Sequence, residues 1–446
     1  MNVPGVLLDE ALAAAAALGA ADAEIVLSTS ADFEVEVADG QVETLALAEC
    51  IGAGVRLFTD DRRMGFAYRT DFTGGMRRLV ESAWQNAKAS EPDEHNLLPD
   101  SSLSSHDDWA EQDFQAVPVQ DKIEFARRLE QKTLHADTRI AQVQTAHYSD
   151  CRFELAIASS RGLRRSYRNA FCACHVVARA AQVGLDPEMG WEFDFGRTFD
   201  SLRVDWCAQS CAQDALRRLG GAPCASGAMP IVLDNRVVAQ ILQVLGPALM
   251  ADSVLRGKSL YAGRLGEPVA SECVEIVDEN ECESGLNRAP FDGEGASAQR
   301  TLLVEGGVLK TFLHNTYTAH IMDAATTANA SRSGFKGVPH VGATNCFLAP
   351  GAGSQADLIA AAGDGLLVTE TMGMHTADPI SGDFSFGAAG LAIQRGQPAR
   401  PVRGVTLAGN IRDLMTNIAS VGSDLRFFGA YGAPSVMISE LMVSGE

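Results

Sequence analysis

The sequence lacks most of the short motifs by which enzymes are recognised. No H-E-x-x-H, C-x-x-C or G-x-S-x-G occurs along the 446 residues, which removes the usual signatures of a zinc peptidase helix, a thiol–disulfide centre and a serine hydrolase. Gly52-Ala-Gly54 is missing the third glycine of a dinucleotide fingerprint. Gly257-Lys-Ser259 copies the end of a phosphate loop, but Asp252 stands where the first glycine belongs. These motifs alone therefore predict no enzyme class.

Basic residues are scarce along the whole chain. The 36 lysines and arginines are outnumbered by 57 aspartates and glutamates, which gives a net charge of −21. A surface this acidic repels phosphate backbones. The densest basic cluster spans an expected turn and is more typical of a solvated hairpin end; it consists of Arg161, Arg164, Arg165 and Arg168. We therefore expect no direct contact with nucleic acid.

The N-terminal region contains no basic residue before Arg56, so the positive segment that opens a secretory signal peptide is missing. The alanine-rich run 11–21 lies between Glu10 and Asp22 and is shorter than the roughly 20 residues that a membrane span needs. The sequence thus predicts a cytoplasmic protein without membrane association. We expect its ten cysteines to stay reduced there.

Two local patterns allow a catalytic or a metal-binding interpretation. Cys172, Cys174 and His175 lie in a strand-like segment, which puts the two thiols on one face and the imidazole on the other. Small buried cysteines are therefore favoured over a metal site. Ser333-Gly-Phe-Lys336 fits S-x-x-K, but its S-D-N and K-T-G companions are missing. A hydrolase built on Ser333 and Lys336, or on a thiol, is the weaker hypothesis.

Periodicity in the first half predicts helix, strands and helix, twice over. The turn Asp39-Gly40 between the alternating segments 32–37 and 41–47 predicts a hairpin. Helices are expected up to Ala17 and over 73–88, 122–135 and 201–219, and 91–108 is expected to be a loop. Further strands are expected over 52–58, 63–69, 140–147, 153–159, 163–167, 170–181 and 192–198.

The second half changes character after a small-residue linker at 223–230. A buried strand over 231–233 and a helix from Asn235 to about Leu249 precede a strand-rich region, in which hairpin turns are expected at Gly306-Gly307 and Gly396-Gln397. The sequence therefore predicts an α+β protein. Residues 1–222 are expected to form an N-terminal domain of two αβ layers, and residues 223–446 a strand-rich C-terminal domain.

Several motifs occur in the order typical of one protein family. They are S-V-L-R-G-K-S (253–259), L-G-E-P-V-A-S (265–271), P-F-D-G-E-G (290–295), L-V-E-G-G-V-L-K (303–310), T-A-N-A-S-R (327–332), S-G-D-F-S (381–385), A-G-N (408–410) and V-G-S-D-L (421–425). V-E-V-A-D-G-Q-V-E-T (35–44) extends the match into the first half. In these motifs the chain resembles the TldD/PmbA family over nearly its whole length.

The resemblance implies a function in proteolysis. The family comprises cytoplasmic proteins once described as modulators of DNA gyrase. TldD and its paralogue PmbA, also called TldE, form a heteromeric zinc peptidase that acts on peptides and unfolded proteins. TldD-type chains carry H-E-x-x-x-H on the helix before the R-G-x-S segment and a cysteine in a late loop. Two histidines and a thiolate would hold zinc, and the glutamate would activate its water.

The zinc-motif positions fall on Leu242, Gln243 and Pro247 when the motif is aligned on Arg256-Gly-Lys-Ser259. Leucine and proline offer no lone pair, glutamine is no general base, and the late loop 421–434 contains no cysteine. The chain therefore resembles the PmbA/TldE-type subunit, for which we expect no catalytic residue and no metal. Zinc is expected in a TldD-type partner of a heteromer, and a homodimer is possible when the chain is alone.

The resemblance also suggests where a substrate binds. A cleft shared with the partner is expected to be lined by Asn329, Ser331, Arg332, Asn345 and Asp383. Strand edges there would hold an extended peptide or an unfolded protein through backbone hydrogen bonds. Turn chemistry is the alternative interpretation of these polar motifs. The alternative function is a non-catalytic regulatory protein that acts on gyrase or on a toxin–antitoxin pair.

Overall fold

The computed structural model describes residues 5–100 and 102–446. The chain packs into two compact units. Unit 1 consists of the described residues up to Leu216 and two later segments, Gly293–Ala296 and Arg332–Pro339; unit 2 consists of Arg217–Asp292, Ser297–Ser331 and His340–Glu446. The C-terminal half thus supplies two short segments to unit 1, which the sequence patterns do not reveal. The predicted domains 1–222 and 223–446 stay a prediction.

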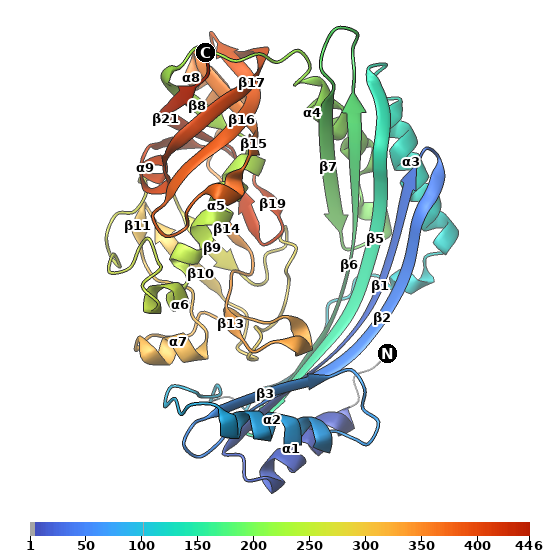
Figure 1. Cartoon of the computed structure of the whole chain (residues 1–446), viewed down its shortest axis with the longest axis vertical. Helices are drawn as coiled ribbons and strands as arrows, with labels where there is room; N and C mark the ends of the chain where they lie inside the picture. The colour runs from blue at the N-terminus through green and yellow to red at the C-terminus, as the bar shows by residue number, and fades with distance from the viewer. Residues whose placement is uncertain (1–4, 101) are drawn as a thin grey trace. The chain divides into compact units, whose positions relative to one another are not determined.

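Unit 1 is built on one long sheet. Its strands are β1 (Asp22–Ala38), β2 (Gln41–Phe58), β3 (Met64–Arg69), β4 (Ser104–Asp108), β5 (Ile140–Ser159), β6 (Arg164–Ala180) and β7 (Glu188–Gly196). They are ordered β3-β2-β1-β5-β6-β4, and β7 also pairs with β6. Helices α1 (Gly5–Ala17) and α2 (Arg77–Ala89) lie at one end of the sheet, and α3 (Val119–Leu134) and α4 (Val204–Leu216) at the other (Figure 1). The two expected αβ layers therefore share a sheet.

The predicted hairpin at Asp39-Gly40 is confirmed. Both residues have positive φ, 49° and 71°, as a two-residue turn between twisted strands requires. The turn is held by α3, because both carboxylate oxygens of the buried Glu130 accept the Gly40 N–H at 3.1 Å. The strand and the helix are thereby fixed to each other at this end of the sheet.

Several strands are longer than the sequence predicts. The expected pairs 41–47 with 52–58, 140–147 with 153–159, and 163–167 with 170–181 are each one continuous strand: β2, β5 and β6. Asp150 interrupts the apolar pattern of β5, yet it is buried and paired with Lys122 at 2.6 Å. The polar segment 104–108 was expected to be a loop, but it forms β4 and pairs in parallel with β6. Such pairing partners cannot be identified from hydropathy.

Unit 2 has two six-stranded sheets, β11-β10-β9-β14-β20-β19 and β17-β16-β15-β8-β21-β18, and the pair β12-β13. The strands are β8 (Gly227–Leu233), β9 (Ile276–Glu279), β10 (Arg300–Glu305), β11 (Val308–Leu309), β12 (Ala330–Ser331), β13 (His340–Val341), β14 (Cys346–Leu348), β15 (Gly365–Met372), β16 (Asp383–Gln394), β17 (Gln397–Asn410), β18 (Ile418–Val421), β19 (Arg426–Phe428), β20 (Tyr431–Ala433) and β21 (Val436–Ser444). The strand-rich C-terminal region is confirmed.

The helices of unit 2 are short: α5 (Asn235–Leu245), α6 (Ala251–Leu255), α7 (Thr316–Ile321), α8 (Gln355–Ala362) and α9 (Ile411–Thr416). Helix α5 carries the buried Val237, Ile241 and Leu245 into the main apolar core, which also includes residues of β8, β9, β15 and β21. The described part of the chain contains no helix with the length and hydrophobicity to span a bilayer.

Two strand glycines let helices lie directly on the sheet of unit 1. A Cβ on Gly65 of β3 would be 2.0 Å from the Ala83 carbonyl oxygen of α2, and one on Gly190 of β7 would be 2.3 Å from the Cys211 carbonyl oxygen of α4. Gly65→Ala and Gly190→Ala should each lower the free energy of unfolding by about 1–3 kcal/mol through overpacking. Urea unfolding followed by tryptophan fluorescence measures this, since all four tryptophans lie in unit 1.

Gly5→Ala is the matched control for these glycine substitutions. Gly5 lies at the exposed start of α1, and a Cβ there meets no atom within 4 Å. We expect no loss of stability from this change. Equal effects at Gly5 and Gly190 would contradict the overpacking explanation.

Candidate functional site

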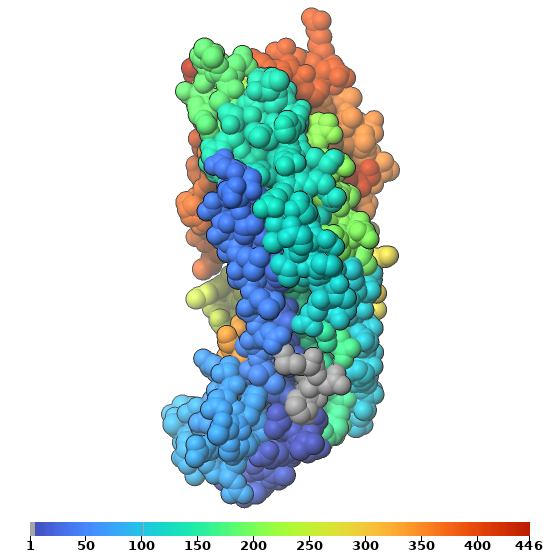
Figure 2. All heavy atoms as spheres, turned by 90° about the vertical axis from the view of Figure 1, so that its right-hand side faces the viewer, coloured from blue at the N-terminus to red at the C-terminus, as the bar shows by residue number. Residues whose placement is uncertain are grey.

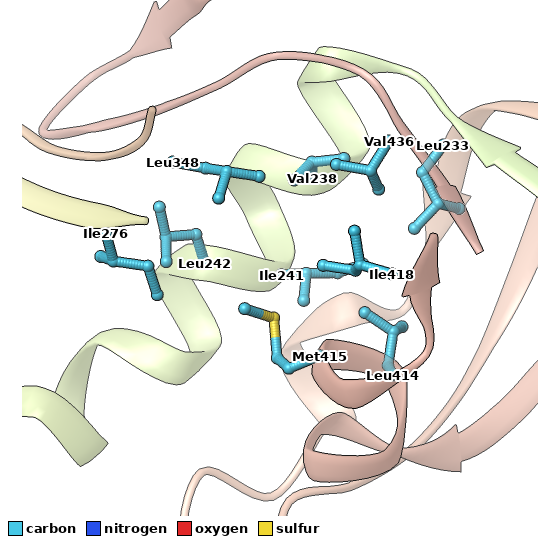
Figure 3. Close-up of a pocket in the computed structure, with 10 residues that line it drawn as sticks. All are labelled: Leu233, Val238, Ile241, Leu242, Ile276, Leu348, Leu414, Met415, Ile418 and Val436. Atoms are coloured by element: carbon cyan, nitrogen blue, oxygen red, sulfur yellow. The ribbon is translucent and has the colours of Figure 1, made fainter. Parts of the chain in front are cut away.

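The position of the first zinc-motif residue lies in the apolar core of unit 2. Asp234 caps α5 by accepting the Arg236 N–H at 3.2 Å, and Pro247 is the second residue of the 3-10 turn Gly246–Leu249 that follows the helix. Leu242 is only 3% exposed and points into a small cavity (Figure 3). The cavity is lined by aliphatic and methionine side chains: Leu233, Val238, Ile241, Leu242, Ile276, Leu348, Leu414, Met415, Ile418 and Val436.

Zinc does not fit these positions. The ten side chains that line the cavity carry no imidazole, carboxylate or thiolate, and an ion placed among them would lose its hydration without gaining ligands. Gln243 is exposed, and the Pro247 side chain has no atom that could bind a metal ion. Throughout residues 5–100 and 102–446, no three histidine, cysteine, aspartate or glutamate side chains are grouped to hold a metal ion. No chemical step can therefore be assigned to a metal in this chain.

A buried polar network holds the T-A-N-A-S motif in place. The amide nitrogen of Asn329 donates to Asp278 Oδ1 at 2.7 Å and to the Gly342 carbonyl at 3.2 Å, while Thr327 donates to Asn329 Oδ1 at 2.7 Å. The second carboxylate oxygen of Asp278 accepts the Thr344 N–H at 2.8 Å. Asn329 is thus fully engaged in joining the motif to β9 and to the segment before β14.

Asn345 forms a second set of buried hydrogen bonds beside the first. Its amide nitrogen donates to the carbonyls of Glu279 and Asn287, both at 2.8 Å, and its amide oxygen accepts the Asn287 N–H at 3.0 Å. Asn329 and Asn345 are therefore brought close together through Asp278, Thr344 and their neighbours. Both asparagines fix backbone segments, and neither has an amide group left over for a ligand.

Asp278 is a member of this network that the sequence did not single out. It is 1% exposed, and burial raises its pKa from 3.8 to about 6, against the lowering effect of its hydrogen bonds to Asn329 and Thr344. Its signal in the sequence is a carboxylate directly after the apolar Ile276 and Val277. A charged residue that continues a buried strand usually has a partner in the core.

Arg332 belongs to unit 1, whereas Ser331 belongs to unit 2. The Arg332 side chain is 4% exposed and pairs with Glu24 of β1, which is itself buried. Its Nε donates to the Gly293 carbonyl at 2.5 Å. Burial lowers the pKa of Arg332 to about 9, so the guanidinium stays charged at neutral pH. Ser331 is half-buried on β12, opposite His340.

Glu24 links Arg332 to a second arginine. Arg56 of β2 pairs with Glu24 at 3.2 Å and with Glu294 at 3.0 Å, and both glutamates are 1% exposed. The four residues Glu24, Arg56, Glu294 and Arg332, hereafter the charge cluster, join both C-terminal segments of unit 1 to its sheet. Only Arg332 was expected to be functional. The other three could have been found from the sequence, because Glu24 and Arg56 are charges within apolar strands and Glu294 lies in a glycine-rich motif.

The glycine pair Gly52 and Gly54 makes room for the same C-terminal segment. A Cβ on Gly52 would lie 2.1 Å from the ring of Phe335, and one on Gly54 would lie 2.3 Å from the Phe335 carbonyl oxygen. Close approach of two backbones explains these glycines without a nucleotide. Next to Phe335, the Lys336 ammonium lies over the phenylalanine ring. Among the described residues, no hydrogen bond joins its side chain to Ser333.

Asp383 lies apart from the asparagine network. It is exposed at the start of β16, where its carboxylate accepts the Asn410 amide at 2.8 Å and its N–H donates to Ser381 at 3.2 Å. No hydrogen bond among the described residues joins it to Asn329 or Asn345. The structure therefore joins Asn329 and Asn345 in one set of hydrogen bonds. Ser331 and Arg332 follow Asn329 in the chain but have partners of their own, and Asp383 pairs with Asn410.

The remaining sequence patterns also have structural explanations. Cys172 and Cys174 are buried, and His175 lies on the other face of β6, where it stacks on His147 at 4.6 Å between ring centroids. The basic cluster is engaged with acidic side chains: Arg161 pairs with Asp22, Arg164 with Asp9, and Arg168 with Asp108. Arg165 donates to Ser105 and to the Gly295 carbonyl.

Comparison with known proteins shows the family. Models of the PmbA/TldA metallopeptidase domain 1, central domain and C-terminal domain match residues 23–87, 112–219 and 226–445. The metalloprotease PmbA of Escherichia coli O157:H7 is 27% identical over 451 residues, which cover 99% of this chain and 96% of that protein.

Two solved structures have the same fold. One, from Thermotoga maritima MSB8, is described as a candidate modulator of a DNA gyrase; it has a TM-score of 0.88 and 26% identity, and the match covers 99% of this chain and 100% of that one. TldE from Thermococcus kodakarensis has a TM-score of 0.91 and 20% identity over 98% of this chain and 100% of that one, a likeness that bears on the fold alone.

Fold and sequence together define a class of α+β proteins whose domains are named for metallopeptidases. This chain belongs to the PmbA/TldD family, as its motifs indicate. Membership supports a peptidase-related role.

The charge cluster predicts a strong dependence of unit 1 on Glu24. Glu24→Gln removes one carboxylate from between two buried arginines, and breaking a buried pair in this way costs about 3–5 kcal/mol. Unfolding in urea, followed by tryptophan fluorescence, should show this loss. Asp61→Asn, which breaks the exposed pair with Arg63, should have little effect. The double variant Glu24→Gln/Arg332→Met should recover part of the stability, and no recovery would contradict the pairing.

Asp278 predicts a pH dependence of unit 2. Because its pKa is about 6 in the folded chain and 3.8 otherwise, the folded state binds more protons between these values. Its contribution to stability therefore falls as pH rises from about 4 to about 6, by on the order of 3 kcal/mol in total. Calorimetry at pH 4.5 and pH 7.5 measures how much the free energy of unfolding changes with pH. This change should be smaller for Asp278→Asn than for the unmodified chain. An equal difference in the two proteins would contradict the assignment.

Proposed function

We propose that this chain is the metal-free, PmbA/TldE-type subunit of a peptidase complex whose zinc is held by a TldD-type partner. In this complex the chain contributes substrate binding and assembly, and the partner cleaves peptides and unfolded proteins. The metal is left to the partner because the residues at the zinc-motif positions of this chain have no ligand chemistry.

The surroundings of Leu242 are the observation that carries this proposal. A leucine could replace a histidine at a site that still held other ligands, but here every side chain that lines the cavity is aliphatic except Met415. Helix α5 also ends two residues before Pro247, so the third motif position is no longer on the helix. These features support a helix that has become part of the apolar core.

In this proposal the accessible residues of the predicted site contact the substrate. Asp383 is exposed and Ser331 is half-buried, so both can reach a bound peptide. Asn329, Asn345 and Arg332 are buried and engaged, and their role in this proposal is to hold the backbone around Ser331 in position. Hydrogen bonds from strand backbone to an extended peptide suit substrates of varied sequence.

A regulatory protein that acts on gyrase or on a toxin–antitoxin pair is the second candidate. It is favoured by the description of the Thermotoga maritima relative. The charge of −21 and the carboxylates paired with the basic cluster oppose direct binding to DNA. Purification of the chain from its own cells separates the two candidates, since recovery of gyrase without a TldD-type chain would favour regulation.

Reconstitution with the TldD-type protein of the same organism tests the leading proposal. The purified chain alone should contain no stoichiometric zinc by elemental analysis and should not cleave an unfolded peptide. The mixture should cleave it, and a chelator should abolish the cleavage. Robust peptidase activity of the metal-free chain without a partner would overturn the proposal.

Variants in the mixed complex separate substrate contact from assembly. Asp383→Ala should raise KM several-fold with the zinc content unchanged, because it removes an exposed side chain of the predicted site. Ser333→Ala is the control and should leave both kcat and KM unchanged. A loss of activity in Ser333→Ala would instead support a hydrolase that uses Ser333 and Lys336.

A further inference from the structure

One border of the unit 1 sheet is a long stretch of strand without a neighbour. Residues Thr44–Cys50 of β2, hereafter the β2 edge, pair with Glu36–Ser30 of β1 on one side. On the other side β3 begins to pair only at Ala53, and no described strand pairs with the β2 edge there. Figure 2 shows the blue atoms of the β1–β2 hairpin as a strip on the surface of the molecule.

The β2 edge is not protected in the ways that sheet borders usually are. Natural edges carry lysine, proline or a bulge that prevents another strand from pairing. The sequence T-L-A-L-A-E-C contains neither lysine nor proline. The irregularity in register falls at Glu43, directly before the β2 edge, because Val37 pairs with Val42 and Glu36 with Thr44. The backbone of the β2 edge is therefore free to accept a further strand.

The side chains of the β2 edge define one face for such a strand. Leu45 lies opposite Val35, and Leu47 opposite Phe33. Val35 and Phe33 are buried on the face that α3 covers, where Lys122 lies over the Phe33 ring. Leu45 and Leu47 nevertheless stay 48% and 69% exposed. They extend an apolar face beyond the helix that covers it.

Acidic residues flank the two leucines at both ends of the β2 edge. Glu49 continues the alternation of Leu45 and Leu47, whereas Glu43 is the extra residue of the bulge between Val42 and Thr44. Both glutamates are exposed. Charges directly opposite one another on paired strands attract when unlike and repel when like. The β2 edge thus presents the pattern acidic, aliphatic, aliphatic, acidic to an incoming strand.

A second copy of the chain does not match this pattern. In an antiparallel pair of two β2 edges, the register that places Leu45 opposite Leu47 also brings Glu43 beside Glu49, twice. The net charge of −21 on each copy adds to this repulsion. A strand with basic residues at the outer positions matches both the charge and the apolar face.

We propose that the β2 edge is a docking surface for an extended segment of another polypeptide, in which two aliphatic residues at alternating positions are flanked by lysine or arginine. The segment adds a strand to the unit 1 sheet by backbone hydrogen bonds. Its aliphatic side chains cover Leu45 and Leu47, and its basic side chains pair with Glu43 and Glu49. This surface is independent of where zinc is held in the proposed complex.

A designed strand tests the proposal on the full chain. The probe is the peptide KTVTITK, blocked at both ends. Its antiparallel register sets the first lysine opposite Glu49, the valine and isoleucine opposite Leu47 and Leu45, and the last lysine beside Glu43 at the bulge. The comparison peptide ETVTITE differs only in charge. We expect KTVTITK to bind at least about tenfold more tightly in fluorescence anisotropy, and amide exchange to slow over residues 44–50. Equal binding of the two peptides, or no binding, would overturn the proposal.

Three variants locate the binding. Leu47→Lys should weaken KTVTITK binding at least about tenfold, whereas Val183→Lys, the same change at a fully exposed turn residue, should not alter it. Glu43→Lys/Glu49→Lys should reverse the preference to ETVTITE. Because these side chains are exposed, the unfolding midpoints should stay close to that of the unmodified chain.

Two results with these proteins would overturn the assignment. One is KTVTITK binding that Leu47→Lys does not weaken, because the peptide would then lie elsewhere. The other is a dimer of the unmodified chain in sedimentation that protects residues 44–50 from exchange and that Leu47→Lys dissociates. That dimer would make a second copy the occupant.

Discussion

The charge cluster is the interaction on which unit 1 depends. It joins Glu24 to Arg332, 308 residues later in the sequence, and Arg56 to Glu294. Apolar burial alone would tolerate many placements of two short segments against a sheet. Four buried charges tolerate few, because each must meet its partner or lose its hydration without compensation. The cluster thus selects one position for both segments, and Gly52 and Gly54 provide the space for it.

Unit 2 uses neutral groups for a similar purpose. Asn329 and Asn345 connect backbone segments that have no regular pairing, and the single carboxylate among them, Asp278, takes hydrogen bonds on both oxygens. The family motif around Asn329 is therefore explained by the construction of a loop, and the chemistry of catalysis is not needed to account for it. The apolar cavity at Leu242 lies in the same unit and differs from these loops, because no polar side chain lines it. Polar residues hold the loops, while helix α5, on which the first two zinc-motif positions fall, packs into the apolar core.

Local sequence patterns predicted most helices and strands of this fold. Contacts between residues far apart in the sequence could not be predicted from them. The hairpin at Asp39-Gly40 follows from turn chemistry, and the opposite faces of Cys174 and His175 follow from alternation. Strand β5 was divided in two because the partner of Asp150, Lys122, is on a helix whose contact with the strand is not visible in the sequence. Strand β4 was missed because its polar residues pair at a sheet border.

The same distinction holds for the candidate site, where the sequence identified residues but not their contacts. Asn329 and Asn345 were selected from motifs, and the structure does place them together. Arg332 was selected from the same motif, but the chain enters unit 1 at that residue, so its neighbours are Glu24 and Gly293 instead. A motif indicates which residues have a role, but it does not indicate which residues they contact. Burial and partners distinguish a group that binds a ligand from one that holds the backbone, and only coordinates supply them.

The two late segments of unit 1 also set an order for biosynthesis. A ribosome makes the chain from its N-terminus, so all seven strands of the sheet emerge before Gly293–Ala296 and Arg332–Pro339 exist. During that interval Glu24 and Arg56 have no C-terminal partners, and the space beside Gly52 is unfilled. Unit 1 can be completed only after about half of unit 2 has been synthesised. The nascent sheet therefore spends much of translation incomplete, in the state in which chaperones commonly bind a chain.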